Sequence, residues 1–360
     1  MYNTANNINS VVAANTDQWT LNNSSWVGYF DAYADHVVDT LNDLDNVLFE
    51  VGNEGGYSAR GWQEHVIDRI HAREAGMAKQ HPVGKTAYGE GAVLGMPTDA
   101  QINTDLLGSH ADWVSLSGRE GEYTSNVTDA PATKVSILDT DHIVGFVDPS
   151  QETTFVQWVW KSLLRGHNPI YLTPQTGYPG GFTNLPSIEN ALGYARMVAK
   201  TVDLEHMTPN DGAASTGFAL VNPNIEYLVY QPAGTNFTVT LPAKTFAYEW
   251  IRTSDAAVTQ SGNLSATSGN NSFTPPYSGA ILHLGPIPPV ITSVRRLSNG
   301  DILLQGTGGV NQVYMVKMSS SLTTTPQAIA TITADANGNF QYEDVNSGSS
   351  AGRFYWVSLR

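Results

Sequence analysis

The length, charge and composition of this chain exclude several classes of protein. Its 360 residues are enough for two or three domains, each with a core of its own. Asp and Glu total 33 against 18 for Lys and Arg, a net charge of −15, so nucleic acid and anionic membrane surfaces are poor partners. The absence of cysteine excludes disulfides, thiol nucleophiles and iron–sulfur clusters.

The composition is that of a protein rich in strands and loops. Only 14% of the residues are charged, while the chain contains 33 Gly, 16 Tyr and 8 Trp. No apolar run approaches the roughly 20 residues of a membrane span, and the N-terminal region lacks the basic and hydrophobic parts of a signal peptide. A secreted protein would look the same once its signal had been removed.

The first part of the chain alternates helical and strand patterns. Trp26, Phe30, Tyr33 and Val37 recur at three- and four-residue spacing, which predicts an amphipathic helix over 25–41. The patterns that follow predict, in chain order, a strand over 46–51, a helix over 62–79, a strand over 82–88, a helix over 98–107, strands over 113–116 and 134–138, a helix over 152–165, a strand over 169–172 and a helix over 187–202. Such alternation predicts a parallel sheet covered by helices.

About five βα units fit before residue 207, whereas eight would close a barrel. The helix over 25–41 is preceded only by an Asn-rich stretch, which we interpret as a loop. We therefore expect an incomplete (β/α) TIM-type barrel over 1–207, without its first three strands.

Short strand-like runs separated by Gly, Asn, Ser and Pro replace the helical patterns after residue 207. A Pro-rich linker at 285–289 then divides the remainder, because such a sequence continues neither a helix nor a sheet. The expected fold is thus α/β plus all-β, with the barrel followed by two small antiparallel β-sandwich domains at 208–285 and 290–360. The strands expected in them lie at 217–221, 225–230, 236–241, 246–251 and 280–284, and at 302–306, 313–318, 328–333, 339–342 and 354–359.

An apolar strand that ends in Asn53-Glu54 is the most informative motif. Catalytic groups of a βα barrel lie at the carboxyl ends of its strands. A partly desolvated Glu54 would have the raised pKa of a general acid, and Asn53 could hydrogen-bond a sugar hydroxyl. The alternative is that both residues cap the following turn.

A second carboxylate is available after a later strand, where Asp139 and Asp141 follow the run over 134–138. In a barrel this strand end would face that of Glu54, which is the two-carboxylate arrangement of glycoside hydrolysis. Two other interpretations remain open. Asp139, Asp141 and His142 could bind a metal ion, or the segment could be a solvated polar loop.

Several segments of the first domain resemble bacterial glycoside hydrolases of the large (β/α)8 retaining clan. They are 6–9 (NNIN), 43–50 (DLDNVLFE) with Asn53-Glu54, 112–115 (DWVS), 139–142 (DTDH), 158–162 (WVWKS), 165–169 (RGHNP) and 194–196 (YAR). Residues up to about 285 share the resemblance, because 215–217 (STG), 226–230 (EYLVY) and 248–250 (YEW) are similar to the collagen-binding-like β-sandwich that follows these barrels. Residues 290–360 resemble immunoglobulin-like modules of secreted bacterial enzymes.

The resemblance implies roles for the carboxylates. In the clan the acid/base Glu follows Asn after the fourth strand, which matches Asn53-Glu54 residue for residue. The nucleophile ends the seventh strand, where the clan usually has Glu and this chain has Asp139, with Asp141 as a competitor for the role. The resemblance also implies three further βα units at the start of the relatives, and a secreted or periplasmic location.

We therefore predict a retaining glycosidase that cleaves a β-linked glycan without a cofactor or metal. The substrate contacts we expect, besides Asn53, are His142, Trp113, Tyr88 and Glu120. The alternative function is a carbohydrate-binding or structural protein whose incomplete barrel has lost catalysis. Because an incomplete barrel exposes sheet edges and apolar surface, we also expect a homo-oligomer, most simply a dimer that completes the barrel.

Overall fold

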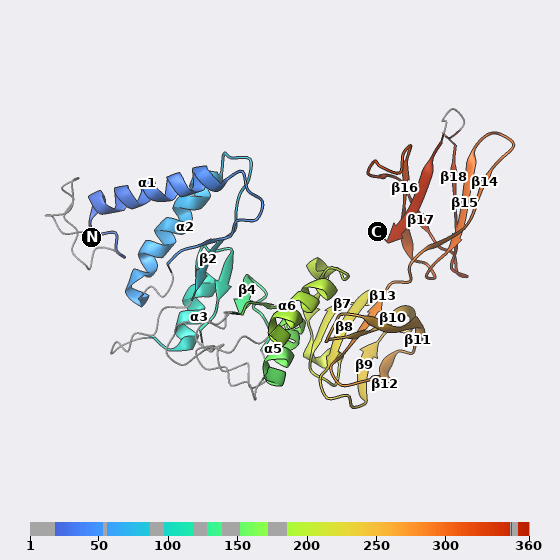
Figure 1. The fold of residues 1–360 in the computed structure, drawn as a ribbon, viewed down its shortest axis with the longest axis horizontal. Helices are drawn as coiled ribbons and strands as arrows, with labels where there is room; N and C mark the ends of the chain where they lie inside the picture. Colours follow the sequence, from blue (N-terminus) through green and yellow to red (C-terminus); the bar gives the residue numbers. More distant parts are fainter. Residues whose placement is uncertain are drawn as a thin grey trace. The chain divides into compact units, whose positions relative to one another are not determined.

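A computed structural model describes residues 19–52, 56–86, 97–117, 128–138, 152–171, 186–345, 347 and 352–359 (Figure 1). The chain divides into two compact units, Met1–Leu192 and Gly193–Arg360, which are described separately. A parallel five-stranded sheet with helices lies in the first unit, and four antiparallel sheets lie in the second. This confirms the predicted fold class.

The sheet of the first unit has its strands in sequence order. They are β1 (Phe49–Glu50), β2 (Val83–Thr86), β3 (Trp113–Ser115), β4 (Val135–Leu138) and β5 (Asn168–Pro169). All four neighbouring pairs are parallel. The helices α2 (Arg60–Glu74), α3 (Asp99–Gly108) and α5 (Glu152–Leu164) connect strands of this sheet, as the strand and helix patterns predict.

Two helices flank these units in the sequence. The first, α1 (Ser24–Leu41), begins at Asn23, whose side chain accepts a hydrogen bond from Trp26 N at 3.2 Å, as an N-cap does. The other, α6 (Pro186–Ala199), is three residues shorter at its end than the pattern predicts. The strand expected over 46–51 is also shorter, since β1 comprises only Phe49 and Glu50.

A ladder of two ion pairs and one histidine–carboxylate hydrogen bond joins α1 to α2. Asp31, Asp35 and Asp39 repeat every four residues on α1 and face His65, Arg69 and Arg73 of α2 at 2.8, 2.5 and 2.6 Å. Residues four apart lie on one face of a helix, so the equal spacing on both helices puts all three pairs in register. The apolar side chains of α1 then pack against the core cluster that includes Trp62, Val66 and Phe49.

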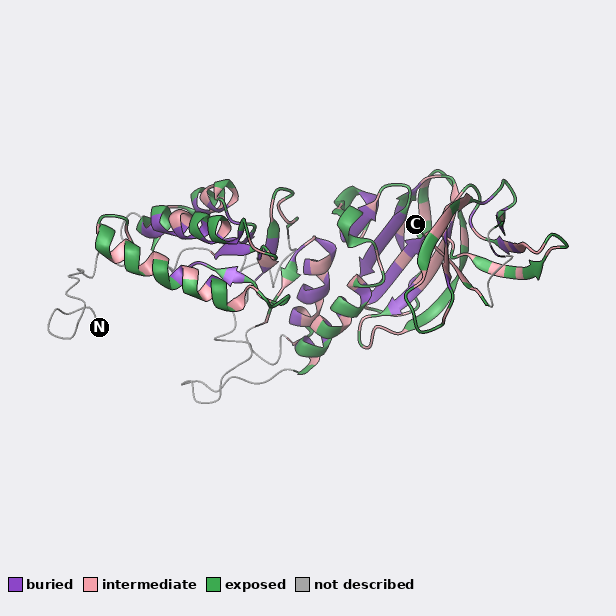
Figure 2. Cartoon of the chain, turned by 90° about the horizontal axis from the view of Figure 1, so that it is seen from above, coloured by how far each residue is buried: buried purple, intermediate pink, exposed green. Residues whose placement is uncertain are grey.

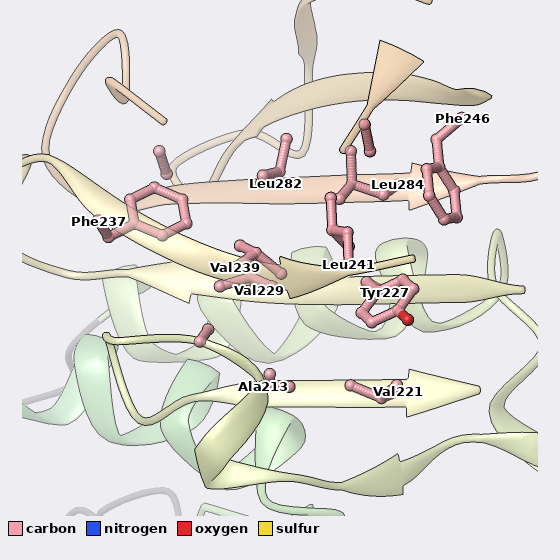
Figure 3. Packing of buried hydrophobic residues seen from close by; sticks show 14 of the residues in the cluster. Ala213, Val221, Tyr227, Val229, Phe237, Val239, Leu241, Phe246, Leu282 and Leu284 are labelled. Carbon is pink, nitrogen blue, oxygen red and sulfur yellow. The ribbon is translucent and has the colours of Figure 1, made fainter. Parts of the chain in front are cut away.

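The second unit begins with one large and one small antiparallel sheet. The strands are β6 (Thr208–Pro209), β7 (Ala219–Asn222), β8 (Glu226–Gln231), β9 (Phe237–Leu241), β10 (Lys244–Arg252), β11 (Val258–Ala266), β12 (Gly269–Phe273) and β13 (Ala280–Gly285). Six of them form a sheet in the order β11-β10-β13-β8-β7-β6, and β12 pairs with β9. Their apolar side chains gather in one core (Figure 3). All six residues of β8 are buried, and Figure 2 shows this sheet mainly in the colour of buried residues.

The remaining strands form two three-stranded sheets. These are β14 (Val290–Arg296), β15 (Ile302–Thr307) and β18 (Asn339–Asp344) in one sheet, and β16 (Val313–Ser319), β17 (Gln327–Thr333) and β19 (Phe354–Leu359) in the other. A small core of Tyr314, Ala334 and Phe340 belongs to this sandwich. The division at 207 and 285–289 into three domains stays a prediction.

Four strands were not predicted from the sequence, the two-residue β6 and the longer β11, β12 and β14. Most residues of β11 are exposed, β12 alternates only between exposed and half-buried residues, and β14 is mainly exposed directly after the Pro-rich linker. Such strands lack the apolar alternation on which the sequence prediction depends. Among the described residues, no helix has the length and apolar character needed to cross a membrane.

Candidate active site at the carboxyl ends of the parallel strands

The parallel order of the first sheet sets where its strands end. Because β1 to β5 all run the same way, their carboxyl ends lie along one edge. The chain leaves this edge after Glu50, Thr86, Ser115, Leu138 and Pro169. In βα folds this is the edge at which functional groups gather.

Most of the predicted site residues follow these strand ends in the sequence. Glu54 comes four residues after Glu50, and Asp139 directly follows Leu138. The residues Asn53, Glu54, Tyr88, Glu120, Asp139, Asp141 and His142 lie outside the described residues, so their positions and roles stay predictions. The metal alternative at Asp139, Asp141 and His142 also lies outside them.

Trp113 is the predicted site residue that the structure describes. It lies on β3 in register with Gly84 of β2, and its side chain is 5% exposed. A Cβ at Gly84 would lie 1.7 Å from Cε2 of Trp113, so the indole lies across β2 where a side chain would stand. Its Nε1 is buried and has no hydrogen-bond partner among the described residues. Trp113 thus packs on the sheet, and its contact with a sugar stays a prediction.

The turn that follows β1 is held by a buried amide and aromatic rings. Gly52 has φ +77°, in the left-handed region that favours glycine. The fully buried Gln63 donates from Nε2 to the Val51 carbonyl at 3.4 Å. Trp62 packs edge-on against Trp19 with ring centroids 4.9 Å apart, and both rings lie close to Gly52. The backbone that leads to Asn53 is therefore fixed as far as Gly52.

Glu50 is a polar group at this edge that we did not assign from the sequence. Its side chain accepts a hydrogen bond from Thr86 Oγ1 at 3.1 Å. The register places Glu50 beside Gly84 and hence on the same face of the sheet as Trp113. The alternation in Phe49-Glu50-Val51 could have indicated this, because Phe49 and Val51 are buried and Glu50 between them points to the other face.

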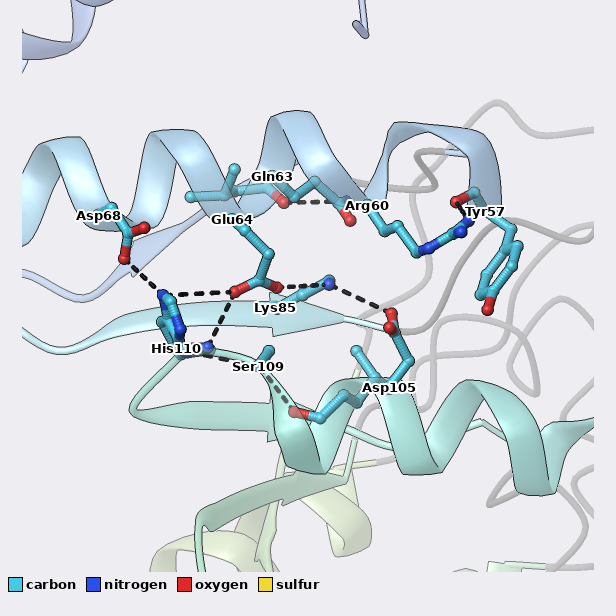
Figure 4. Close-up of polar contacts among 12 residues, drawn as sticks. Tyr57, Arg60, Gln63, Glu64, Asp68, Lys85, Asp105, Ser109 and His110 are labelled. Atoms are coloured by element: carbon cyan, nitrogen blue, oxygen red, sulfur yellow. Dashed lines mark hydrogen bonds and ion pairs between the residues drawn. The ribbon is translucent and has the colours of Figure 1, made fainter. Parts of the chain in front are cut away.

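A second polar cluster lies on the opposite face, between α2 and α3 (Figure 4). The side chain of Lys85 is fully buried, and its Nζ lies 2.8 Å from Glu64 Oε1 and 3.5 Å from Asp105 Oδ2. The other oxygen of Glu64 accepts the His110 backbone N–H at 2.9 Å, and the His110 ring contacts Asp68 at 2.6 Å. A buried charge held in this way joins β2 to both helices. The sheet separates this cluster from the face that carries Trp113.

The described residues offer one trio that could hold a metal ion. Asp203, Glu205 and His206 bring their ligand atoms within 4.8 Å of one another, and all three are exposed. His206 Nδ1 contacts Asp203 Oδ2 at 2.8 Å, and this hydrogen bond raises the pKa of the imidazole. An exposed acidic pair with its histidine already bound to one carboxylate is an ordinary surface feature.

Comparison with known proteins gives a distant structural likeness. No protein-family model matches the chain, and no curated protein matches its sequence. Among solved structures, it is similar to an α-L-fucosidase of family GH29 from Bacteroides thetaiotaomicron, captured as a trapped covalent intermediate. The identity is 13% and the TM-score 0.42, over 75% of this chain. The chain spans less than two thirds of that protein, 64% of its length.

Proposed function

We propose that this chain is a retaining glycoside hydrolase that cleaves a β-linked glycan, with Glu54 as acid/base and Asp139 as nucleophile. The observation that supports the proposal is the parallel order of β1 to β4. Both carboxylates follow strands that end at the same edge of one sheet, Glu54 after β1 and Asp139 after β4. Asp141 is the second candidate for the nucleophile.

The sheet order sets a geometric demand on this mechanism. Strands β1 and β4 are three spacings apart, or roughly 14 Å across a flat sheet at about 4.8 Å per strand. Retention needs carboxyl groups about 5 to 5.5 Å apart, and inversion about 6.5 to 9.5 Å. The proposed mechanism therefore requires the carboxyl groups of Glu54 and Asp139 to approach each other over β2 and β3. We expect the shorter separation.

The remaining roles belong to the same proposal. Asn53 would hydrogen-bond the sugar 2-hydroxyl, and His142, Tyr88, Glu120 and Trp113 would line the bound sugar. No cofactor takes part. Because an enzyme encounters polymeric glycans outside the cytoplasm, we also propose that the protein is secreted or periplasmic.

Glu54→Gln tests the assignment of the acid/base. The amide cannot donate the proton that a poor leaving group needs, so we expect a loss of roughly 10² or more in kcat/KM on such substrates and a smaller loss on activated aryl glycosides. The screen covers β- and α-linked aryl glycosides, including an α-L-fucoside, and soluble polysaccharides. Glu205→Gln is the matched control, because it makes the same change at an exposed carboxylate outside this sheet. Equal activity of the Glu54→Gln variant and the wild type would contradict the role.

A non-catalytic carbohydrate-binding protein is the second candidate function. The open order of the described sheet favours it, because β1 and β5 each have one neighbour there rather than two. Turnover distinguishes the two functions. Glycan binding without hydrolysis of any glycoside, in wild type and Glu54→Gln alike, would support the binding protein.

We also propose that the chain associates with a second copy through the sheet of the first unit. Leu48, Val135 and Ile170 are 51%, 55% and 47% exposed on or beside this sheet. Val135 is in register with Trp113, so it lies on the face that carries Glu50 and Trp113. Exposed apolar side chains beside free strand edges are a common site of self-association.

A further inference from the structure

A polar groove of about 570 Å³ lies on the sandwich formed by β14 to β19. Its lining comes from β14, β15 and β18 of one sheet, from the end of β17 in the other sheet and from the connection between β17 and β18. The side chains that matter here are Thr292, Gln305, Thr307, Thr333, Asn339 and Gln341. The described residues that line it include one carboxylate, Asp335, and no Lys or Arg. Hydroxyl and amide groups therefore dominate its chemistry.

The strand register places these groups in two rungs. Gln305 of β15 is opposite Gln341 of β18, and Thr307 is opposite Asn339. Because residues two apart on a strand point to the same face, both rungs share one face of the sheet. Cross-strand neighbours lie about 4.5 to 5.5 Å apart, and successive rungs about 7 Å apart along the strands. The groove thus offers a regular set of hydrogen-bonding groups.

The two glutamine amides are available to a ligand. Within the described part of the chain, no hydrogen bond engages the side chain of Gln305 or Gln341, and each amide can both donate and accept. The carboxylate of Asp335 is already occupied, since its Oδ1 accepts the backbone N–H groups of Asn337 and Asn339, both at 2.8 Å. These bonds hold the pKa of Asp335 below its usual value.

The position of the groove limits what it can bind. It crosses β15, the central strand of β14-β15-β18, whose backbone groups are used in pairing on both sides. An extended peptide that adds a strand needs a free backbone edge, which this face does not provide. A polyanion needs cationic side chains, which the lining lacks. Neutral hydroxyl groups match the paired amides and threonines.

We propose that this groove binds an uncharged oligosaccharide chain, as a second glycan site that takes no part in catalysis. The site goes beyond the proposed hydrolase and does not depend on Glu54. It would hold a polymer through β15 and β18 while leaving the reacting bond to another part of the chain.

Affinity electrophoresis of the full chain tests the site. The gels contain soluble β-glucan, xylan, galactomannan or, as the polyanion, polygalacturonate. We expect at least one neutral polysaccharide to retard the wild type, and Gln305→Ala/Gln341→Ala to weaken that binding roughly tenfold or more, because two ligand hydrogen bonds are lost together. Gln341 is exposed and Gln305 is half-buried, so the fold should persist, which a thermal midpoint checks.

Two control variants separate this site from other sources of binding. Gln260→Ala removes an exposed amide from β11, outside the groove, and should bind as the wild type does. Glu54→Gln should also bind unchanged, so that a failure of the proposed hydrolase and a failure of this site are distinguishable. Retardation by polygalacturonate alone, no retardation by any neutral polysaccharide, or equal retardation of the double variant and the wild type would each overturn the proposal.

Discussion

The imidazole of His283 lies between two carboxylates of neighbouring strands. Its Nε2 is 2.7 Å from Glu226 Oε1 on β8, and its Nδ1 is 3.4 Å from Glu249 Oε2 on β10. Burial alone disfavours the charged ring, but the hydrogen bonds and charges of both carboxylates outweigh it and raise the pKa of His283 to about 9. The second Glu226 oxygen accepts the Asp203 backbone N–H at 3.0 Å, so the same network holds the segment that enters the sandwich.

This raised pKa predicts how stability depends on pH. The folded state holds the proton more tightly than the unfolded chain, whose histidine has the ordinary pKa of 6.5. The stabilisation is therefore fully present below about pH 6.5 and is lost as the pH rises through about 9, on the order of 3 kcal/mol. Urea unfolding at a series of pH values measures it. His283→Gln should remove this decline, and an unchanged decline in that variant would contradict the assignment.

Gly84 and Trp113 provide a packing prediction at the same scale. Gly84→Ala would place a Cβ 1.7 Å from the indole, so Trp113 or the backbone must move, at a cost of about 1 to 3 kcal/mol in the free energy of unfolding. The matched control is Gly61→Ala on α2, where nothing lies within 4 Å and the helix gains about 0.5 to 1 kcal/mol. Opposite shifts of the urea midpoint are expected, and a stabilising Gly84→Ala would contradict the contact.

The ladder between α1 and α2 is an interaction between elements. Arg69 and Arg73 lower the pKa values of Asp35 and Asp39 through their hydrogen bonds. Without these partners, carboxylates four residues apart on one helix would repel each other. The pairs are mainly exposed, so each contributes little, but together they fix which faces of the two helices meet.

A charge swap tests the ladder. Asp35→Arg and Arg69→Asp should each lower the thermal midpoint, because each places like charges across the pair, whereas the two changes together should restore most of the loss. The losses should shrink in 1 M salt, where exposed charges are screened. Single variants that leave the midpoint unchanged at low salt would show that the helices pair through their apolar side chains alone.

The proposed self-association is tested on the whole molecule. Light scattering should give a mass near twice the 38.8 kDa of one chain, and Val135→Lys/Ile170→Lys should reduce it to that of one chain. Both side chains are exposed in the single chain, so the charges should not prevent folding. Val258→Lys, at an equally exposed position on β11, is the control. A wild type that stays a monomer at high concentration would contradict the proposal.

Local patterns determined much of this fold. The three- and four-residue spacing of apolar side chains gave the position of α1, and apolar runs between turns gave β2, β3 and β4, because burial on one face imposes the helical or strand period on the sequence. The exposed β11, β12 and β14 carry no such period, so their pairing partners decide that they are strands. The candidate carboxylates likewise follow from sequence position alone, after strand ends whose parallel order the structure describes.

Tertiary structure alone decided which distant side chains meet. Nothing in the local sequence relates Lys85 to Glu64 and Asp105, His283 to Glu226, or Thr86 to Glu50, since each contact joins different elements. Likewise, position 84 excludes a side chain only because Trp113 of the next strand lies over it. A repeating burial pattern can be recognised from residues that are neighbours in the sequence. Strand register and helix pairing instead depend on which surfaces pack together in the folded chain. The groove of Gln305 and Gln341 exists for the same reason, because pairing of β15 with β18 places the two amides side by side.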